Sequence, residues 1–125
     1  MQKVKERDPL RQYILLKALV DLGFAEIDAE IYLFLAKAGP QNGRNIAKML
    51  KLYKQQLYRR LKRLQTKGVI FATCARPAQF SAISLEKVLD LMIETKKEQV
   101  SAWQERKKAL LATWSSLIEK GSPNN

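Results

Sequence analysis

The sequence contains no histidine and only one cysteine, Cys74. The missing histidine removes the commonest general base and the commonest metal ligand. A single cysteine excludes an intrachain disulfide and a cysteine-rich zinc site. The glycine-rich patterns of nucleotide-binding loops and the GxSxG pattern of hydrolases are also absent. We therefore expect a protein that is not an enzyme and that holds no metal and no cofactor.

Long apolar runs are absent as well. No run reaches the roughly 18 consecutive apolar residues of a membrane-spanning helix. The N-terminal residues, from Met1 to Asp8, are charged and lack the apolar core of a signal sequence. The 125 residues suffice for one domain of ordinary size with a helical appendage. We expect a cytoplasmic protein without a membrane partner.

Carboxylates are missing from the middle of the chain. None occurs between Glu30 and Glu86, whereas eleven of the 23 Lys and Arg residues lie in this span. The other twelve basic residues are balanced by the 12 acidic ones, so the span accounts for the whole formal charge of +11. Such a local field suits a polyanion, and nucleic acid is the first candidate. The alternative is a basic surface that serves only solubility, although such surfaces usually intersperse both signs.

Four segments have the apolar spacing of α-helices: 9–22, 26–37, 43–50 and 53–67. Asp8 and Pro9 are typical of a helix start, and Asn42 is a candidate N-cap. Gly68 is suited to end the fourth segment. The residues expected to face inward in the second segment are Ile27, Ile31, Phe34, Leu35 and Ala38. Those of the third are Ile46, Ala47 and Leu50, and those of the fourth are Leu57, Leu61 and Leu64.

Two short β runs follow, Val69 to Cys74 and Gln79 to Ile83. The four-residue connection between them predicts a hairpin with Arg76 at its tip. Cys74 is interpreted as a small strand residue that packs, rather than as a redox-active thiol.

Residues 85–120 contain neither glycine nor proline and form one long helical pattern that Ser84 could cap. Its apolar residues alternate in steps of three and four, if Lys96 and Lys107 occupy two positions of the same stripe. This pattern indicates a coiled-coil-like dimerisation helix. A membrane-surface helix is less favoured, since charges of both signs surround the segment. The predicted dimerisation residues are Leu89, Ile93, Val100, Trp103, Leu110, Trp114 and Leu117.

The order of elements predicts a mainly α fold with a small β-hairpin, namely a winged helix-turn-helix followed by a long C-terminal helix. We expect residues 1–84 to form the DNA-binding domain, 85–121 the dimerisation helix and 122–125 a disordered tail. The fourth helix could lie in a major groove, with the wing on the adjacent backbone or minor groove. Its predicted base-facing residues are Lys54, Gln55, Tyr58, Arg59 and Lys62. The predicted phosphate or wing contacts are Arg44, Lys48 and Arg76.

Each assignment has a structural alternative. The basic face of the fourth helix could be merely solvated, and Arg76 could be an ordinary loop arginine. Gln56 is a second candidate for a base contact if the helix is slightly rotated. Arg60 and Arg63 lie nearer the buried flank, where they could extend along the surface or reach phosphate.

Several of these stretches together resemble the DNA-binding domain of the TrmB family of transcriptional regulators, found mainly in archaea. The stretches are Leu22-Gly23-Phe24, Glu30-Ile31-Tyr32, Gly39-Pro40, Ile46-Ala47, the run from Leu57 to Leu64, Lys67-Gly68-Val69-Ile70, and the wing from Arg76 to Ile83. The resemblance covers residues 19–90, and single pieces of it are shared with MarR-like and other winged-helix families. It implies a winged helix-turn-helix that binds DNA.

The chain also departs from the family pattern. Ala25 stands where a Ser or Thr cap is usual, which predicts a weaker start of the second helix. Lys51 stands where the family commonly has glycine, which predicts a backbone cost if the turn needs a positive φ. Gln55 replaces a small residue, which predicts a different base preference. Because about 35 residues follow the wing, we expect no sugar effector domain in this chain.

The sequence therefore predicts a homodimeric, nucleoid-associated regulator that binds double-stranded DNA with sequence preference. The dimer would read two half-sites about one helical turn apart, or a multiple of it. Two alternatives stay open. One is an architectural chromatin protein that binds DNA without sequence choice, and the other is a winged-helix interaction module in a transcription or RNA assembly.

Overall fold

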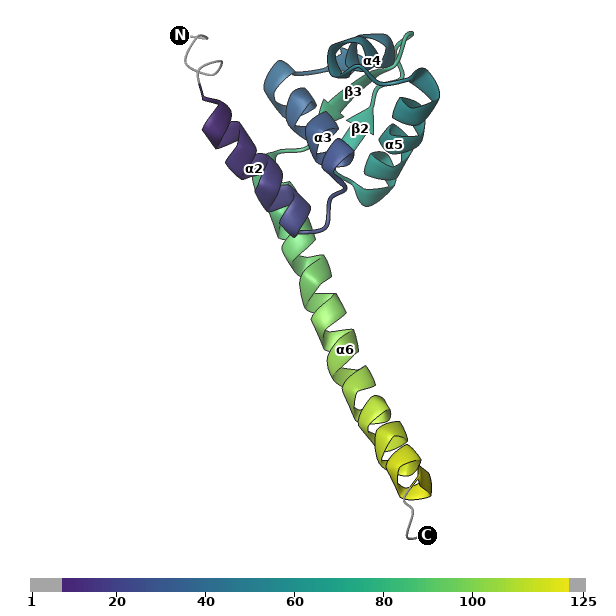
Figure 1. The fold of residues 1–125 in the computed structure, drawn as a ribbon. Helices are drawn as coiled ribbons and strands as arrows, with labels where there is room; N and C mark the ends of the chain where they lie inside the picture. Colours follow the sequence, from purple (N-terminus) through teal and green to yellow (C-terminus); the bar gives the residue numbers. More distant parts are fainter. Residues whose placement is uncertain (1–7, 122–125) are drawn as a thin grey trace. The chain divides into compact units, whose positions relative to one another are not determined.

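The computed structural model describes residues 8–121, with side chains for residues 8–119 (Figure 1). The described chain is mainly α-helical, with a three-stranded antiparallel sheet and a long C-terminal helix. This confirms the predicted fold class. The chain divides into two compact units after Asp90. The predicted tail at 122–125 lies outside the described residues, and the predicted boundary between 84 and 85 stays a prediction.

The first two helices lie close to their predicted bounds. Helix α2 spans Pro9–Asp21, and the Asp8 carboxylate accepts a hydrogen bond from the backbone N–H of Arg11 at 3.4 Å. Helix α3 spans Glu26–Ala38, and its N-cap, Ala25, makes no side-chain hydrogen bond. Helix α3 therefore begins without the side-chain cap that Ser or Thr would provide, as the sequence predicts.

The helix-turn-helix consists of α4, Gly43–Leu50, and α5, Lys54–Lys67. Asn42 caps α4, because its side chain accepts a hydrogen bond from the Asn45 backbone N–H at 2.8 Å. Lys51 in the turn has φ 57° and ψ 48°, so the left-handed conformation that glycine usually adopts is imposed on a lysine. Gly68 ends α5 in the same left-handed region, as its position in the sequence predicts.

The sheet has the strand order β1–β3–β2. Strand β2, Ile70–Ala72, and strand β3, Gln79–Ala82, form the predicted hairpin, although both are shorter than expected. Strand β1, Gln41–Asn42, pairs antiparallel with β3, with Gln41 opposite Phe80 and Asn42 opposite Gln79. Strand β1 was not predicted, because two residues are too few to show an alternating pattern.

The core of the globular unit lies between the helices and the sheet. The Leu57, Leu61 and Leu64 side chains of α5 are all at most 1% exposed, as predicted. Tyr32 of α3 is also fully buried, and its hydroxyl donates a hydrogen bond to the backbone carbonyl of Ile83. Burial raises the pKa of Tyr32. The remaining side chains that the core encloses almost completely include Leu19, Ile31, Leu35, Ile46, Val69, Ile70 and Val88.

Two predicted burials are wrong. Ala38 is exposed, because it is the last residue of α3 and precedes the chain reversal at Gly39 and Pro40. Cys74 is also exposed, because β2 ends at Ala72 and the thiol lies in the loop of the wing rather than in a strand.

Helix α6 spans Leu85–Gly121, a length of 37 residues. The Ser84 hydroxyl accepts a hydrogen bond from the Lys87 backbone N–H at 3.3 Å, so the predicted cap is formed. The first residues of α6, as far as Asp90, belong to the globular unit, where Val88 is fully buried. Within the described part of the chain, no helix combines the length and apolar character that a membrane span requires.

Candidate nucleic-acid interface

Helix α5 buries its apolar face and presents a basic, polar face to solvent. Its five predicted base-facing side chains are all exposed: Lys54, Gln55, Tyr58, Arg59 and Lys62. Gln56 is only half-buried, so it lies nearer the core than Gln55 does. The exposed set combines amide and guanidinium groups, which are the side chains that pair with adenine and guanine edges in a major groove.

The Tyr58 side chain is partly exposed and also packs against other residues of the globular unit. Its ring is 43% exposed and meets the ring of Phe80 edge-on, with 6.3 Å between centroids and an interplanar angle of 69°. Its hydroxyl lies so close to Gly43 that a Cβ at this position would overlap it. Tyr58 therefore joins α5 to the start of α4 and to the middle strand of the sheet. From the sequence, Tyr58 was predicted only as a groove contact, and this packing was not predicted.

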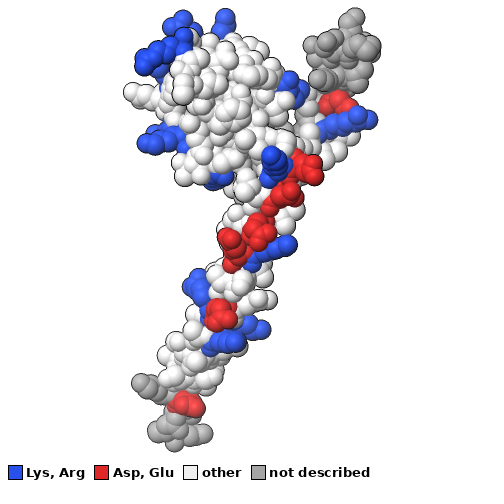
Figure 2. Space-filling model, turned by 180° about the vertical axis from the view of Figure 1, so that it is seen from behind, with Lys and Arg blue, Asp and Glu red and all other residues white. Residues whose placement is uncertain are grey.

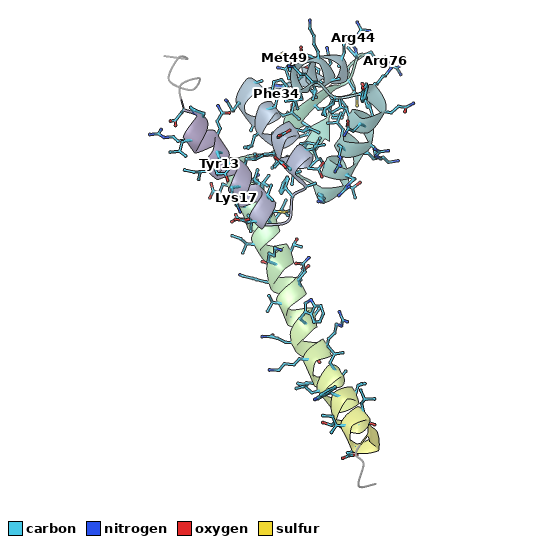
Figure 3. The ribbon with its side chains drawn as sticks, viewed as in Figure 1. Tyr13, Lys17, Phe34, Arg44, Met49 and Arg76 are labelled. Carbon is cyan, nitrogen blue, oxygen red and sulfur yellow. The ribbon has the colours of Figure 1, made fainter. Side chains whose placement is uncertain are left out.

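A hollow of about 620 Å³ opens between α4, α5 and the wing. It brings together two cations that were predicted to have different roles, Arg44 on α4 and Lys54 on α5, with Tyr58 and Pro77 beside them. Figure 3 shows Arg44 and Arg76 projecting from the same region of the globular unit. Two cations and a tyrosine hydroxyl around one hollow suit an anionic group such as a backbone phosphate.

The end of α4 and the turn that follows it expose two large side chains that were not predicted as contacts. Met49 is 57% exposed, and Tyr53, the N-cap of α5, is 86% exposed. Lys48 and Lys51 of the same region are also exposed. The signal in the sequence is the position of Tyr53, because the residue at the start of a recognition helix is well placed to reach DNA. An aromatic ring there can contact a sugar or a thymine methyl group.

The wing is ordered by its own side chains. The Thr73 hydroxyl accepts hydrogen bonds from the backbone N–H groups of Ala75, at 3.4 Å, and Gln79, at 3.1 Å. Arg76 is exposed at the tip, where the sequence places it, and Cys74 is exposed beside it. The wing therefore presents a guanidinium to solvent on a short, internally bonded loop.

The two remaining arginines of α5 point to a carboxylate rather than to solvent alone. Arg60 Nη1 lies 3.4 Å and Arg63 Nη2 lies 3.9 Å from the carboxylate of Asp28 on α3. Asp28 is fully buried, whereas Arg60 is 23% and Arg63 54% exposed. Arg60 thus lies near the buried flank, as the sequence predicts, whereas Arg63 is exposed. Asp28 shares the inward face of α3 with Tyr32 and Leu35. An acidic residue on that face was the signal in the sequence for this pair.

Charge is unevenly distributed over the surface. In Figure 2, Lys and Arg side chains project around the globular part, whereas side chains of both signs lie along α6. In the sequence of α6, carboxylates recur four residues apart at Glu86, Asp90, Glu94 and Glu98. Among the residues that the structure describes, no group of three or more possible acidic, cysteine or histidine ligands could hold a metal ion.

Beyond Asp90, α6 carries a broad exposed apolar stripe. Of the predicted dimerisation residues, six are between 45% and 60% exposed, and Leu89, within the globular unit, is half-buried. Those six are Ile93, Val100, Trp103, Leu110, Trp114 and Leu117. Leu111 and Ile118 are also exposed and widen the stripe. The Arg106 guanidinium covers one face of the Trp103 ring at 4.1 Å from its centroid.

Helix α2 adds a second apolar surface, within the globular unit. Leu10, Tyr13 and Ile14 are each more than half exposed. A groove of about 690 Å³ lies between α2 and α3, with Tyr13 and Phe34 on its walls (Figure 3). Exposed apolar residues that recur along two helices are typical of an interface between chains.

The arrangement of α3, α4, α5 and the β2–β3 wing is that of a winged helix-turn-helix. The sequence pattern of the family described as "Sugar-specific transcriptional regulator TrmB" matches residues 19–86. The match spans more than half of the chain, so the chain belongs to the TrmB family. The resemblance seen in the sequence is confirmed, and the chain is a transcriptional regulator of the winged-helix type. No curated protein is significantly similar to it in sequence.

Several solved structures share the fold. The ST1889 protein from the archaeon Sulfolobus tokodaii is 22% identical, with a TM-score of 0.58 over 70% of this chain and 97% of that one. The transcriptional regulator Tm0710 from Thermotoga maritima is 20% identical, with a TM-score of 0.53 over 97% and 96%. The oxidized form of MarR from E. coli is 16% identical, with a TM-score of 0.52 over 98% and 95%. The family and the Thermotoga neighbour are both described as transcriptional regulators.

Proposed function

We propose that this protein binds double-stranded DNA with sequence preference, with α5 in the major groove and the wing on the adjacent backbone or minor groove. The observation that supports it best is the face of α5. Three leucines fix its inner side, and its outer side carries Gln55, Arg59 and Lys62 in a span without carboxylates. Gln55 and Arg59 are suited to adenine and guanine edges, and Lys62 to phosphate.

The phosphate contacts of this proposal come from the surroundings of α5. Arg44 and Lys54 share the hollow beside the wing, and Lys48 is exposed on α4. Arg76 would reach the next backbone segment or a narrow minor groove. Tyr53 and Tyr58 would add contacts with sugars or base edges at the start of α5. Such contacts fix the register of the protein on the duplex, whereas Gln55 and Arg59 would choose the sequence.

The same proposal includes a homodimer. The apolar stripe of α6 and the exposed face of α2 are too extensive to be left in water without a partner. A second copy would cover them and would place two recognition helices on one duplex. Two half-sites about one helical turn apart, or a multiple of it, would then be read together.

Selection of bound duplexes from a random pool, at two salt concentrations, tests the proposal. We expect a defined sequence with two related half-sites, and an affinity for it at least 1,000-fold above that for random duplex. Equal affinity for selected and random duplexes, with a steep salt dependence, would instead indicate an architectural protein. Failure to bind duplex at moderate salt, together with tight binding to a protein or RNA, would indicate an interaction module.

A further inference from the structure

Asp28 on α3 is the charged side chain that the core of the described residues encloses completely. Its carboxylate faces two guanidiniums of α5, at 3.4 Å from Arg60 and 3.9 Å from Arg63. Neither Asp28 Oδ2 nor Arg60 Nε has a hydrogen-bond partner among the described residues. A buried charge is costly unless its partners satisfy it fully, and here they do so only in part.

Stability alone does not explain this pair. A well-packed pair of apolar side chains at such a position is usually as stabilising as the ion pair, or more so. An ion pair differs from apolar packing in being directional. A directional contact between α3 and α5 can fix their relative orientation.

The contact fixes the rotation of α5 about its own axis. The inner face of the helix consists of Leu57, Leu61 and Leu64, which limits the rotation to the range that keeps these side chains buried. Within that range apolar contact is not directional. Arg60 and Tyr58 are two residues apart and so point about 200° apart around the helix. Arg60 is held by Asp28 on one flank, and Tyr58 packs against Gly43 and Phe80 on the other.

The pair also sorts the cations of α5. Arg60 and Arg63 face a carboxylate and are partly neutralised by it. No ion pair with an acidic side chain is present for Arg59 or Lys62 in the described structure, and both side chains are exposed. The buried carboxylate thus draws Arg60 toward the protein, whereas Arg63, at 3.9 Å and 54% exposed, stays open to solvent as Arg59 and Lys62 do.

We propose that Asp28 is a positioning residue that determines the sequence discrimination of this protein, by setting the rotation of α5 and by withholding Arg60 from DNA. This rests on the proposed function of α5 in the major groove. Asp28 touches no DNA in this proposal and acts through the orientation of Gln55 and Arg59.

Three variants of the full chain test it. Asp28→Asn removes the charge and keeps the shape, and Asp28→Leu with Arg60→Met replaces the ion pair by apolar packing that preserves folding. Asp21→Asn is the matched control, because Asp21 is an exposed carboxylate paired with Lys17 on α2, and its loss changes the net charge equally. Affinities for the selected duplex and for random duplex are measured at two salt concentrations.

We expect the ratio of the two affinities to fall at least tenfold in both Asp28 variants and to stay unchanged in Asp21→Asn. In Asp28→Asn the affinity for random duplex should also rise severalfold, because Arg60 is released. A wild-type ratio in the Asp28→Leu, Arg60→Met variant overturns the proposal. An equal loss of affinity for both duplexes in the Asp28 variants overturns it as well.

A measurement without DNA separates this proposal from the proposed function. Wild-type protein that does not prefer its selected duplex contradicts the proposed function itself. Amide hydrogen exchange of residues 54–67 in the Asp28→Leu, Arg60→Met variant then tests whether Asp28 fixes the rotation of α5. Faster exchange, at a melting temperature equal to or above that of the wild type, supports a rotation fixed by Asp28, and unchanged exchange contradicts it.

Discussion

The hydroxyl of Tyr58 occupies the space where any residue other than glycine at position 43 would place its Cβ. This contact joins the first residue of α4 to the exposed face of α5. Glycine is therefore required here for close approach rather than for an unusual backbone angle, and the geometry of the candidate interface depends on one missing methyl group.

The first prediction concerns this contact. Gly43→Ala should lower the free energy of unfolding by about 1–3 kcal/mol, because the added methyl group displaces the Tyr58 ring. Chemical denaturation of the full chain measures the change. In a Tyr58→Ala background the same substitution should cost much less, since the space is then open. Equal costs in both backgrounds would show that the overlap does not matter.

The second prediction concerns the turn between α4 and α5. Lys51 has a positive φ, which costs a non-glycine residue roughly 1–2 kcal/mol. Lys51→Gly should therefore raise the melting temperature by a few degrees. Lys51→Ala is the control, because it removes the same charge but keeps the strained backbone, and it should give no such gain. A similar rise in both variants would assign the effect to charge instead.

The third prediction separates base contacts from phosphate contacts on α5. Lys62→Ala should weaken binding about equally on all duplexes and should reduce the salt slope by about 1. Gln55→Ala should change the preferred base at one or two positions, with a loss of about 1–3 kcal/mol on the original site. Selection from a random pool with each variant checks both. An unchanged preferred sequence for Gln55→Ala would exclude Gln55 from base recognition.

The fourth prediction concerns the stripe on α6. Trp114→Glu places a charge on this surface and should convert dimers to monomers in sedimentation equilibrium. Ser116→Glu, about 200° around the same helix from Trp114, is the control and should leave the dimer intact. Both sites are exposed, so the globular unit should keep its melting temperature. A dimer of undiminished affinity in Trp114→Glu would contradict the proposed interface.

This substitution is a better test than truncation after Ile83, which the sequence alone suggests. Val88 is fully buried within the globular unit, so that truncation would remove part of its core. Loss of dimers in the truncated chain would then result either from the missing interface or from the damaged core. A point substitution beyond Asp90 changes only the proposed interface.

The helices were predictable because each carries its own local signals. Apolar spacing, the Asn42 cap and the terminal Gly68 gave bounds within one or two residues of those observed. Wing residues were harder to place, because strands of three and four residues have little pattern, and Cys74 was therefore assigned to a strand that ends before it. Helix spacing predicts which residues share a face, but it does not show whether that face meets the core.

The candidate site was predictable in composition but not in its contacts. The missing carboxylates identified the basic span, and the leucines of α5 identified its outer face. The pairing of Asp28 with Arg60 joins residues 32 positions apart, and the contact of Tyr58 with Gly43 depends on how two helices meet. Such contacts are set by tertiary packing, which no local pattern encodes. The exposure of Tyr53 likewise became visible only in the fold.

Strand β1 gives the wing a second attachment. Because Gln41 and Asn42 pair with β3, the hairpin is bonded to the segment that also caps α4. A hairpin joined only at its base would lose conformational freedom when it settles on a ligand, and that loss would reduce affinity. Here much of that freedom is already given up during folding. A displacement of the wing would also act on α4 through these two residues, so the globular unit should meet its ligand with the wing and α4 moving together.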